Sequence, residues 1–151
     1  MRKTLDVSLR PAIWPGDVYL TGLTPDMAAE VHALLDMAYS GGQGTLAPFP
    51  EWWASLRSDA EFDPSLCFLA RDSKGIIGVA QCWTSGFVKD LAVHARRRNQ
   101  GIAASLLLHA FSVFKERGAT AVDLKVIKGN TPAIRLYLRL GMEIIPSAHP
   151  S

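Results

Sequence analysis

The chain has 151 residues, of which 48% are hydrophobic and 20% charged, and its formal net charge at pH 7 is +2. This length and composition are typical of one soluble globular domain, spanning residues 1–151, with a substantial hydrophobic core. The small net charge argues against a dedicated nucleic-acid-binding protein, which is usually more basic. The sequence shows no signal peptide and no apolar run long enough to span a membrane, so we expect a cytoplasmic protein without a membrane partner.

The two cysteines, Cys67 and Cys82, both lie in apolar, strand-like runs. Neither has another cysteine or a histidine at metal-ligand spacing. We therefore expect two buried thiols rather than a disulfide, and no bound metal.

The first half of the chain predicts one strand and two helices. In chain order these are a strand at 17–22, a helix from Thr24 to about Ala38, a loop at 40–44 and a short helix from Pro50 or Glu51 to about Ser58. Thr24 is expected to cap the first of these helices, with Pro25 at its first position.

The second half predicts a mixed sheet. Its elements are strands at 66–71, 76–83 and 87–93, a helix at about 101–117, a strand at 119–126, a helix capped by Thr131 and closed by Gly141, and a short strand at 142–146. The first three strands read as an antiparallel meander, whereas a strand–helix–strand unit implies a parallel pair. The expected fold class is therefore α/β, a mixed β-sheet of antiparallel meander plus one parallel strand, flanked by helices in a single domain.

A basic turn connects the strand at 87–93 to the long helix. Arg96, Arg97 and Arg98 precede Gly101, where the helix opens on small residues. The start of a helix exposes unpaired backbone N–H groups and the positive end of its dipole, so this arrangement favours a phosphate-bearing ligand. The glycine spacing of dinucleotide-binding proteins and the Gly-Lys-Ser/Thr of a P-loop are both absent.

Two segments do fit a known pattern. Arg98–Ala103 matches Arg/Gln-x-x-Gly-x-Gly/Ala, and 130–142 matches Asn-x-x-Ala-x-x-Leu-Tyr-x-x-x-Gly with a final apolar residue. In both sequence and order these segments resemble the cofactor motifs of the GNAT family of N-acetyltransferases. The resemblance covers residues 66–145 well, and the first 60 residues only by pattern.

The resemblance implies acetyl-CoA as acyl donor and direct attack by a primary amine of a small molecule, peptide N-terminus or lysine. The implied cofactor-binding residues are Leu91, Ala92, Val93, Arg98, Asn99, Gln100, Gly101, Ile102, Ala103, Asn130 and Tyr137. Backbone groups of 91–93 would pair with the pantetheine arm, and the amides of 98–103 would hold the pyrophosphate. A backbone N–H near Leu91 would polarise the thioester carbonyl, and Tyr137 would protonate the departing thiolate.

The general base is less well defined by the sequence. Asp90 is the nearest carboxylate on the key strand, and it either helps to deprotonate the amine or forms structural hydrogen bonds while water takes the proton. Strand alternation predicts that Val88, Asp90 and Ala92 share one face. His94 is the nearest histidine, but it lies at the pyrophosphate end of the strand, away from the acyl group.

An aromatic wall is the expected acceptor pocket. The predicted acceptor-binding residues are Glu51, Trp52, Trp53, Trp83 and Phe87. Such a wall suits an amine that carries an apolar or ring group, although core packing explains each tryptophan equally well.

The sequence departs from the family pattern at its C-terminal end, where only five residues follow Pro146 and the final hairpin is shortened. A smaller sheet, an N-terminal segment or a second subunit, as in a homodimer, would then account for the open edge. Two rival functions remain, a non-catalytic acyl-CoA-binding module of the same fold and a nucleic-acid-binding domain that uses 96–98.

Overall fold

The computed structural model of the chain describes residues 1–5, 8–40 and 45–146, so the predicted loop at 40–44 lies almost wholly outside the described residues. The strands are β1 (Arg2–Thr4), β2 (Tyr19–Thr21), β3 (Phe62–Asp72), β4 (Gly75–Trp83), β5 (Phe87–Val93) and β6 (Ala121–Leu124). The helices are α1 (Ala28–Tyr39), α2 (Phe49–Ser58), α3 (Ile102–Glu116) and α4 (Thr131–Arg139), with 3₁₀ turns η1 (Pro25–Met27) and η2 (Ala95–Arg97).

The strands form one sheet in the order β1-β6-β5-β4-β3-β2. Every neighbouring pair is antiparallel except β5 and β6, which are parallel. The predicted meander of β3, β4 and β5 and the parallel strand after the long helix are both confirmed. Within the described ranges, no helix is long and apolar enough to cross a membrane.

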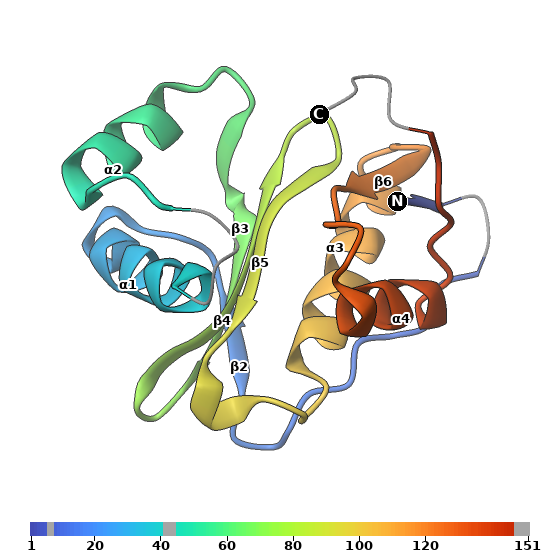
Figure 1. Cartoon of the computed structure of the whole chain (residues 1–151), viewed down its shortest axis with the longest axis horizontal. Coiled ribbons are helices and arrows are strands. Elements are labelled where there is room, and N and C mark those ends of the chain that lie inside the picture. Colours follow the sequence, from blue (N-terminus) through green and yellow to red (C-terminus); the bar gives the residue numbers. More distant parts are fainter. Residues whose placement is uncertain (6–7, 41–44, 147–151) are drawn as a thin grey trace.

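Helices cover both faces of this sheet. Figure 1 shows α1 and α2 on one side of the central strands, and α3 with α4 on the other. Alternation along β3 explains the two layers, because Leu66 and Phe68 pack towards α3 whereas Cys67 and Leu69 pack towards α1 and α2. The largest buried side chains on the α3 side are Phe111 and Phe114. Both cysteines are free and buried, as expected.

The edge beyond β6 differs from the prediction. The predicted strand at 142–146 is not formed, because β1 occupies the place beside β6. The segment makes only one isolated bridge, between Glu143 and Arg2 of β1. The Arg2 guanidinium also holds the Asp123 carboxylate at 2.8 Å. Among the described residues, the N-terminal strand β1 therefore covers the outer edge of β6.

Two predicted helix starts are wrong by a few residues. Thr24 does not cap α1, because its hydroxyl bonds the Asp26 carboxylate and the first turn after Pro25 is 3₁₀. At α4 the cap is Asn130 rather than Thr131, since the Asn130 side-chain oxygen accepts the Ala133 N–H at 3.3 Å.

Candidate functional site

Strands β5 and β6 separate after a short parallel contact. Phe87 pairs with Asp123 and Val88 with Leu124, and the ladder goes no further. On its other side β5 pairs with β4 through a β-bulge. The adjacent β4 residues Gln81 and Cys82 pair with Asp90 and Val88, so Lys89 between them has no partner in this ladder. The β-bulge overturns the predicted alternation, because it places Val88 with the α3 layer and Ala92 with the α1 layer.

A cavity of about 280 Å³ lies where the two strands separate. Its described walls come from the end of α1, from β5, from the residues after β6 and from α4. They are Ala38, Tyr39, Val88, Lys89, Leu91, Leu124, Lys125, Val126, Ile127, Asn130 and Tyr137. The structure therefore brings Leu91 of β5 together with Asn130 and Tyr137 of the second motif segment.

Tyr137 is partly buried against the α3 layer, and burial raises the pKa of its hydroxyl. A raised pKa keeps this phenol protonated at neutral pH, so it can donate a proton inside the cavity. Asn130 contributes its backbone and side chain at the start of α4, where the side chain is already used as the helix cap.

Tyr39 is a cavity residue that the sequence did not indicate. Its hydroxyl donates to Asp90, and burial together with the negative charge of Asp90 raises its pKa. Tyr39, the last residue of α1, is 51 positions from Asp90 in the chain, so no sequence pattern links these two residues. Asp90 is 5% exposed, and its second oxygen accepts from the Lys89 ammonium at 3.1 Å. Both oxygens of Asp90, the carboxylate considered as a general base, therefore already accept hydrogen bonds within the protein.

The turn between β5 and α3 presents its backbone to solvent. Asn99 and Gly101 have φ angles of 62° and 78°, and nothing lies within 4 Å of a Cβ placed on Gly101. The left-handed geometry at Gly101 lets α3 begin at Ile102, and no side chain caps the first N–H groups of the helix. This open start can accept an anionic group without moving any side chain.

Beside this turn a second groove, of about 500 Å³, separates α3 from α4. Gln100 and Gly101 border it at the turn, and Leu108 and Leu136 belong to its longer apolar walls. The N-terminal segment closes one side, since the Ile13 carbonyl accepts from the Ser105 hydroxyl. A ligand bound at the turn therefore has adjacent space along α3.

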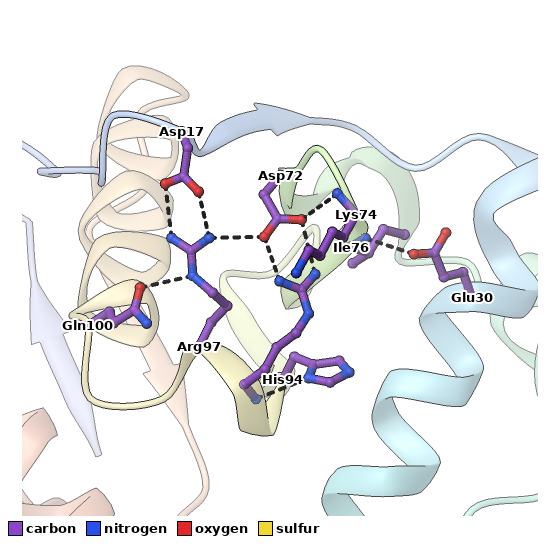
Figure 2. A network of polar contacts seen from close by, with 9 residues as sticks. Asp17, Glu30, Asp72, Lys74, Ile76, His94, Arg97 and Gln100 are labelled. Carbon is purple, nitrogen blue, oxygen red and sulfur yellow. Dashed lines mark hydrogen bonds and ion pairs between the residues drawn. The ribbon is translucent and has the colours of Figure 1, made fainter.

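Two of the three arginines in the turn are held by acidic residues. Figure 2 shows Asp72 between the two guanidinium groups, with Arg97 also reaching Asp17 and Gln100. Arg96 binds Asp72 through two bonds of 2.7 and 3.0 Å, and Arg97 binds the same carboxylate at 2.9 Å. These arginines therefore fix the turn to the β3–β4 hairpin, while Arg98 is exposed.

Asp72 gives the structure a pH dependence. Its carboxyl group is 5% exposed, and chiefly its bonds to Arg96 hold its pKa well below the ordinary value. A depressed folded-state pKa stabilises the fold above the unfolded value of about 4, and this contribution is lost as pH falls towards the folded value. We expect Asp72→Asn to lower the unfolding free energy at pH 7, and the difference from wild type to shrink below about pH 4.

Urea unfolding of both proteins at pH 7 and pH 3 measures this difference. Asp36→Asn, at an exposed position on α1, is the matched control and is expected to leave stability almost unchanged. A deficit in Asp72→Asn that stays constant from pH 7 to pH 3 would contradict the assignment.

The predicted acceptor wall lies mostly elsewhere. Trp52 is 6% exposed and packs with Trp53, His32 and Phe49 between α1 and α2. Trp83 lies 6.0 Å from the Lys89 ammonium, measured to the ring centroid. None of the five predicted residues is among the described residues that line the cavity, which are given above: Glu51, Trp52, Trp53, Trp83 and Phe87. Their role in binding an acceptor remains a prediction.

The chain belongs to the GNAT acetyltransferase family. The sequence model described as "Acetyltransferase (GNAT) family" matches residues 29–142. The mycothiol acetyltransferase of Clavibacter sepedonicus is 32% identical over 136 residues, which are 83% of this chain and 42% of that protein. This chain thus spans less than half the length of that relative.

Solved structures agree with this assignment. The GCN5-related N-acetyltransferase from Sphaerobacter thermophilus has a TM-score of 0.79 and 28% identity, over 94% of this chain and 46% of its own. Arabidopsis thaliana Naa50, solved with the bisubstrate analogue CoA-Ac-MVNAL, shares the fold with a TM-score of 0.66 and 22% identity, over 86% and 85% of the two chains.

Proposed function

We propose that this chain is an acetyl-CoA-dependent N-acetyltransferase that acts on a primary amine. The observation that carries the proposal is the shared cavity of Leu91, Asn130 and Tyr137, at the point where β5 leaves β6. At the other end of β5, the open turn at Gly101 offers a site for phosphates. One strand therefore connects a place for a thioester with a place for the pyrophosphate of coenzyme A.

The residues present fit this donor. Beyond Val88 the β6-facing side of β5 has no ladder partner, so the backbone of 91–93 is available to pair with an extended pantetheine arm. The amides from Arg98 to Ala103 surround the exposed start of α3. Acetyl-CoA supplies the acyl group as a thioester, and the family membership supports its use.

The proposed chemistry is a direct transfer. The neutral amine attacks the thioester carbonyl carbon, so a C–N bond forms and the C–S bond breaks. A backbone N–H near Leu91 stabilises the charge that develops on the oxygen, and Tyr137 gives its proton to the leaving thiolate. Because Asp90 is bound by both Tyr39 and Lys89, we assign it a structural role and assign the proton of the amine to water.

An acceptor screen tests the proposal. The protein is incubated with acetyl-CoA and a library of small amines, peptide N-termini and lysine peptides, and free thiol is measured together with the mass of the product. We expect amine-dependent thiol release and an acetylated acceptor. Binding of acetyl-CoA with no turnover on any amine would instead identify a non-catalytic acyl-CoA-binding module.

A further inference from the structure

Two lysines stand at the point where β5 and β6 separate. The last parallel pair is Val88 with Leu124, and the next residues in the chain are Lys89 on β5 and Lys125, which directly follows β6. Both are exposed, and both line the 280 Å³ cavity with Tyr137. Each of these lysines therefore brings one positive charge to the lining of the cavity.

The protein itself compensates only one of these charges. The Lys89 ammonium is bound by Asp90 at 3.1 Å, and the other oxygen of Asp90 accepts from Tyr39. Lys125 has no hydrogen bond or ion pair with any residue in the described parts of the chain. Asp123, two positions before it on β6, is bound through both carboxylate oxygens by Arg2.

The described lining of the cavity therefore carries positive charge. No Asp or Glu is among its described lining residues, whereas two lysines are. A simple alkylammonium ion would be repelled on entry, and the pantetheine arm of the donor carries no charge that could compensate Lys125. A substrate that brings its own anionic group converts this repulsion into a charge-assisted hydrogen bond.

We propose that the acceptor is a small amine that also carries a carboxylate or a similar anionic group, and that Lys125 receives this group. The inference rests on the proposed N-acetyltransferase function and names its substrate class. Lys125 is then the residue that selects the acceptor, and Tyr137 and Leu91 act on the thioester a short distance away in the same cavity.

Binding measurements test the acceptor class without requiring turnover. Glycine and β-alanine are compared with their amides, which keep the amine and remove the negative charge, by calorimetry on the protein saturated with CoA. We expect each acid to bind roughly tenfold more tightly than its amide, the size expected for a hydrogen bond to a charged group.

Lys125→Met should remove this preference and leave CoA affinity unchanged. Lys128→Met, an exposed lysine outside the cavity lining, should keep the preference.

Three results would overturn the inference. The first is equal binding of acid and amide by the wild-type protein, and the second is an equal effect of the two lysine variants on that preference. The third is a loss of CoA affinity in Lys125→Met without a change in the acid-to-amide ratio. Turnover is then measured on the same compounds with acetyl-CoA and with succinyl-CoA. A Lys125-dependent preference for succinyl-CoA would place the anion on the donor and would also overturn it. Acid-selective binding without any acyl transfer would refute the proposed function and leave the anion site standing.

Discussion

Gly101→Glu is expected to abolish the stabilisation of the protein by acetyl-CoA. With ligand at about 100 times its Kd, binding stabilises the wild-type fold by about 2.7 kcal/mol. For a chain of this size, that raises Tm by roughly 5–10 °C. A glutamate at position 101 places a carboxylate beside the uncapped N–H groups of α3, where it repels the pyrophosphate and occupies the open space. Thermal melts with and without acetyl-CoA measure the shift.

Gly118→Glu is the matched control for this experiment. Gly118 also has a positive φ, 85° against 78° at Gly101, and also has no atom within 4 Å of an added Cβ. Both substitutions therefore have a similar backbone cost, but Gly118 lies at the opposite end of α3. We expect Gly118→Glu to melt lower and still show the full ligand shift. A normal shift in Gly101→Glu would refute the assignment of the cofactor turn.

Tyr137→Phe is expected to lower kcat by roughly 10²-fold and to leave acetyl-CoA affinity almost unchanged, because general acid catalysis contributes about this factor. The substitution removes only the hydroxyl of this cavity residue and keeps the ring that packs against the core. Because burial raises the pKa of Tyr137, the wild-type phenol remains a proton donor through neutral pH.

Steady-state kinetics on an acceptor found in the screen give kcat, and calorimetry gives the Kd of acetyl-CoA. Tyr19→Phe is the control, since Tyr19 is 50% exposed on β2 at the far edge of the sheet. A kcat equal to that of wild type in Tyr137→Phe would remove this residue from the mechanism.

The local features of the turn between β5 and α3 could be predicted from the sequence. Short-range rules of propensity and capping predict the apolar strand, the start of the helix after Gly101 and its end at Gly118. The parallel pairing of β5 with β6 followed in turn, because a helix connects them. The grouping of Asn130 with Tyr137 also depended on one short helix, α4.

Long-range contacts could not be predicted in this way. The bulge at Lys89 depends on how β5 meets β4, and strand periodicity alone predicted a regular alternation that the structure overturns. Tyr39 joins Asp90 only because α1 packs across β5. The pairing of Arg97 with Asp17, 80 positions away, likewise decides whether an arginine faces a ligand or holds the fold together. Sequence patterns identify charged residues but do not pair them.

The strand β1 connects the two ends of the described chain, and this has a kinetic consequence. Arg2 and Asp123 are 121 positions apart, so their pairing closes almost the whole chain into one loop. Contacts between residues so distant in the chain form late, so we expect β1 to dock after the β3–β5 meander and α3 have formed. As a three-residue strand at the edge of the sheet, β1 is expected to open at a lower free energy than the central strands β3 to β5. Because β6 also provides Leu124 in the cavity wall, each detachment leaves that wall supported from one side only.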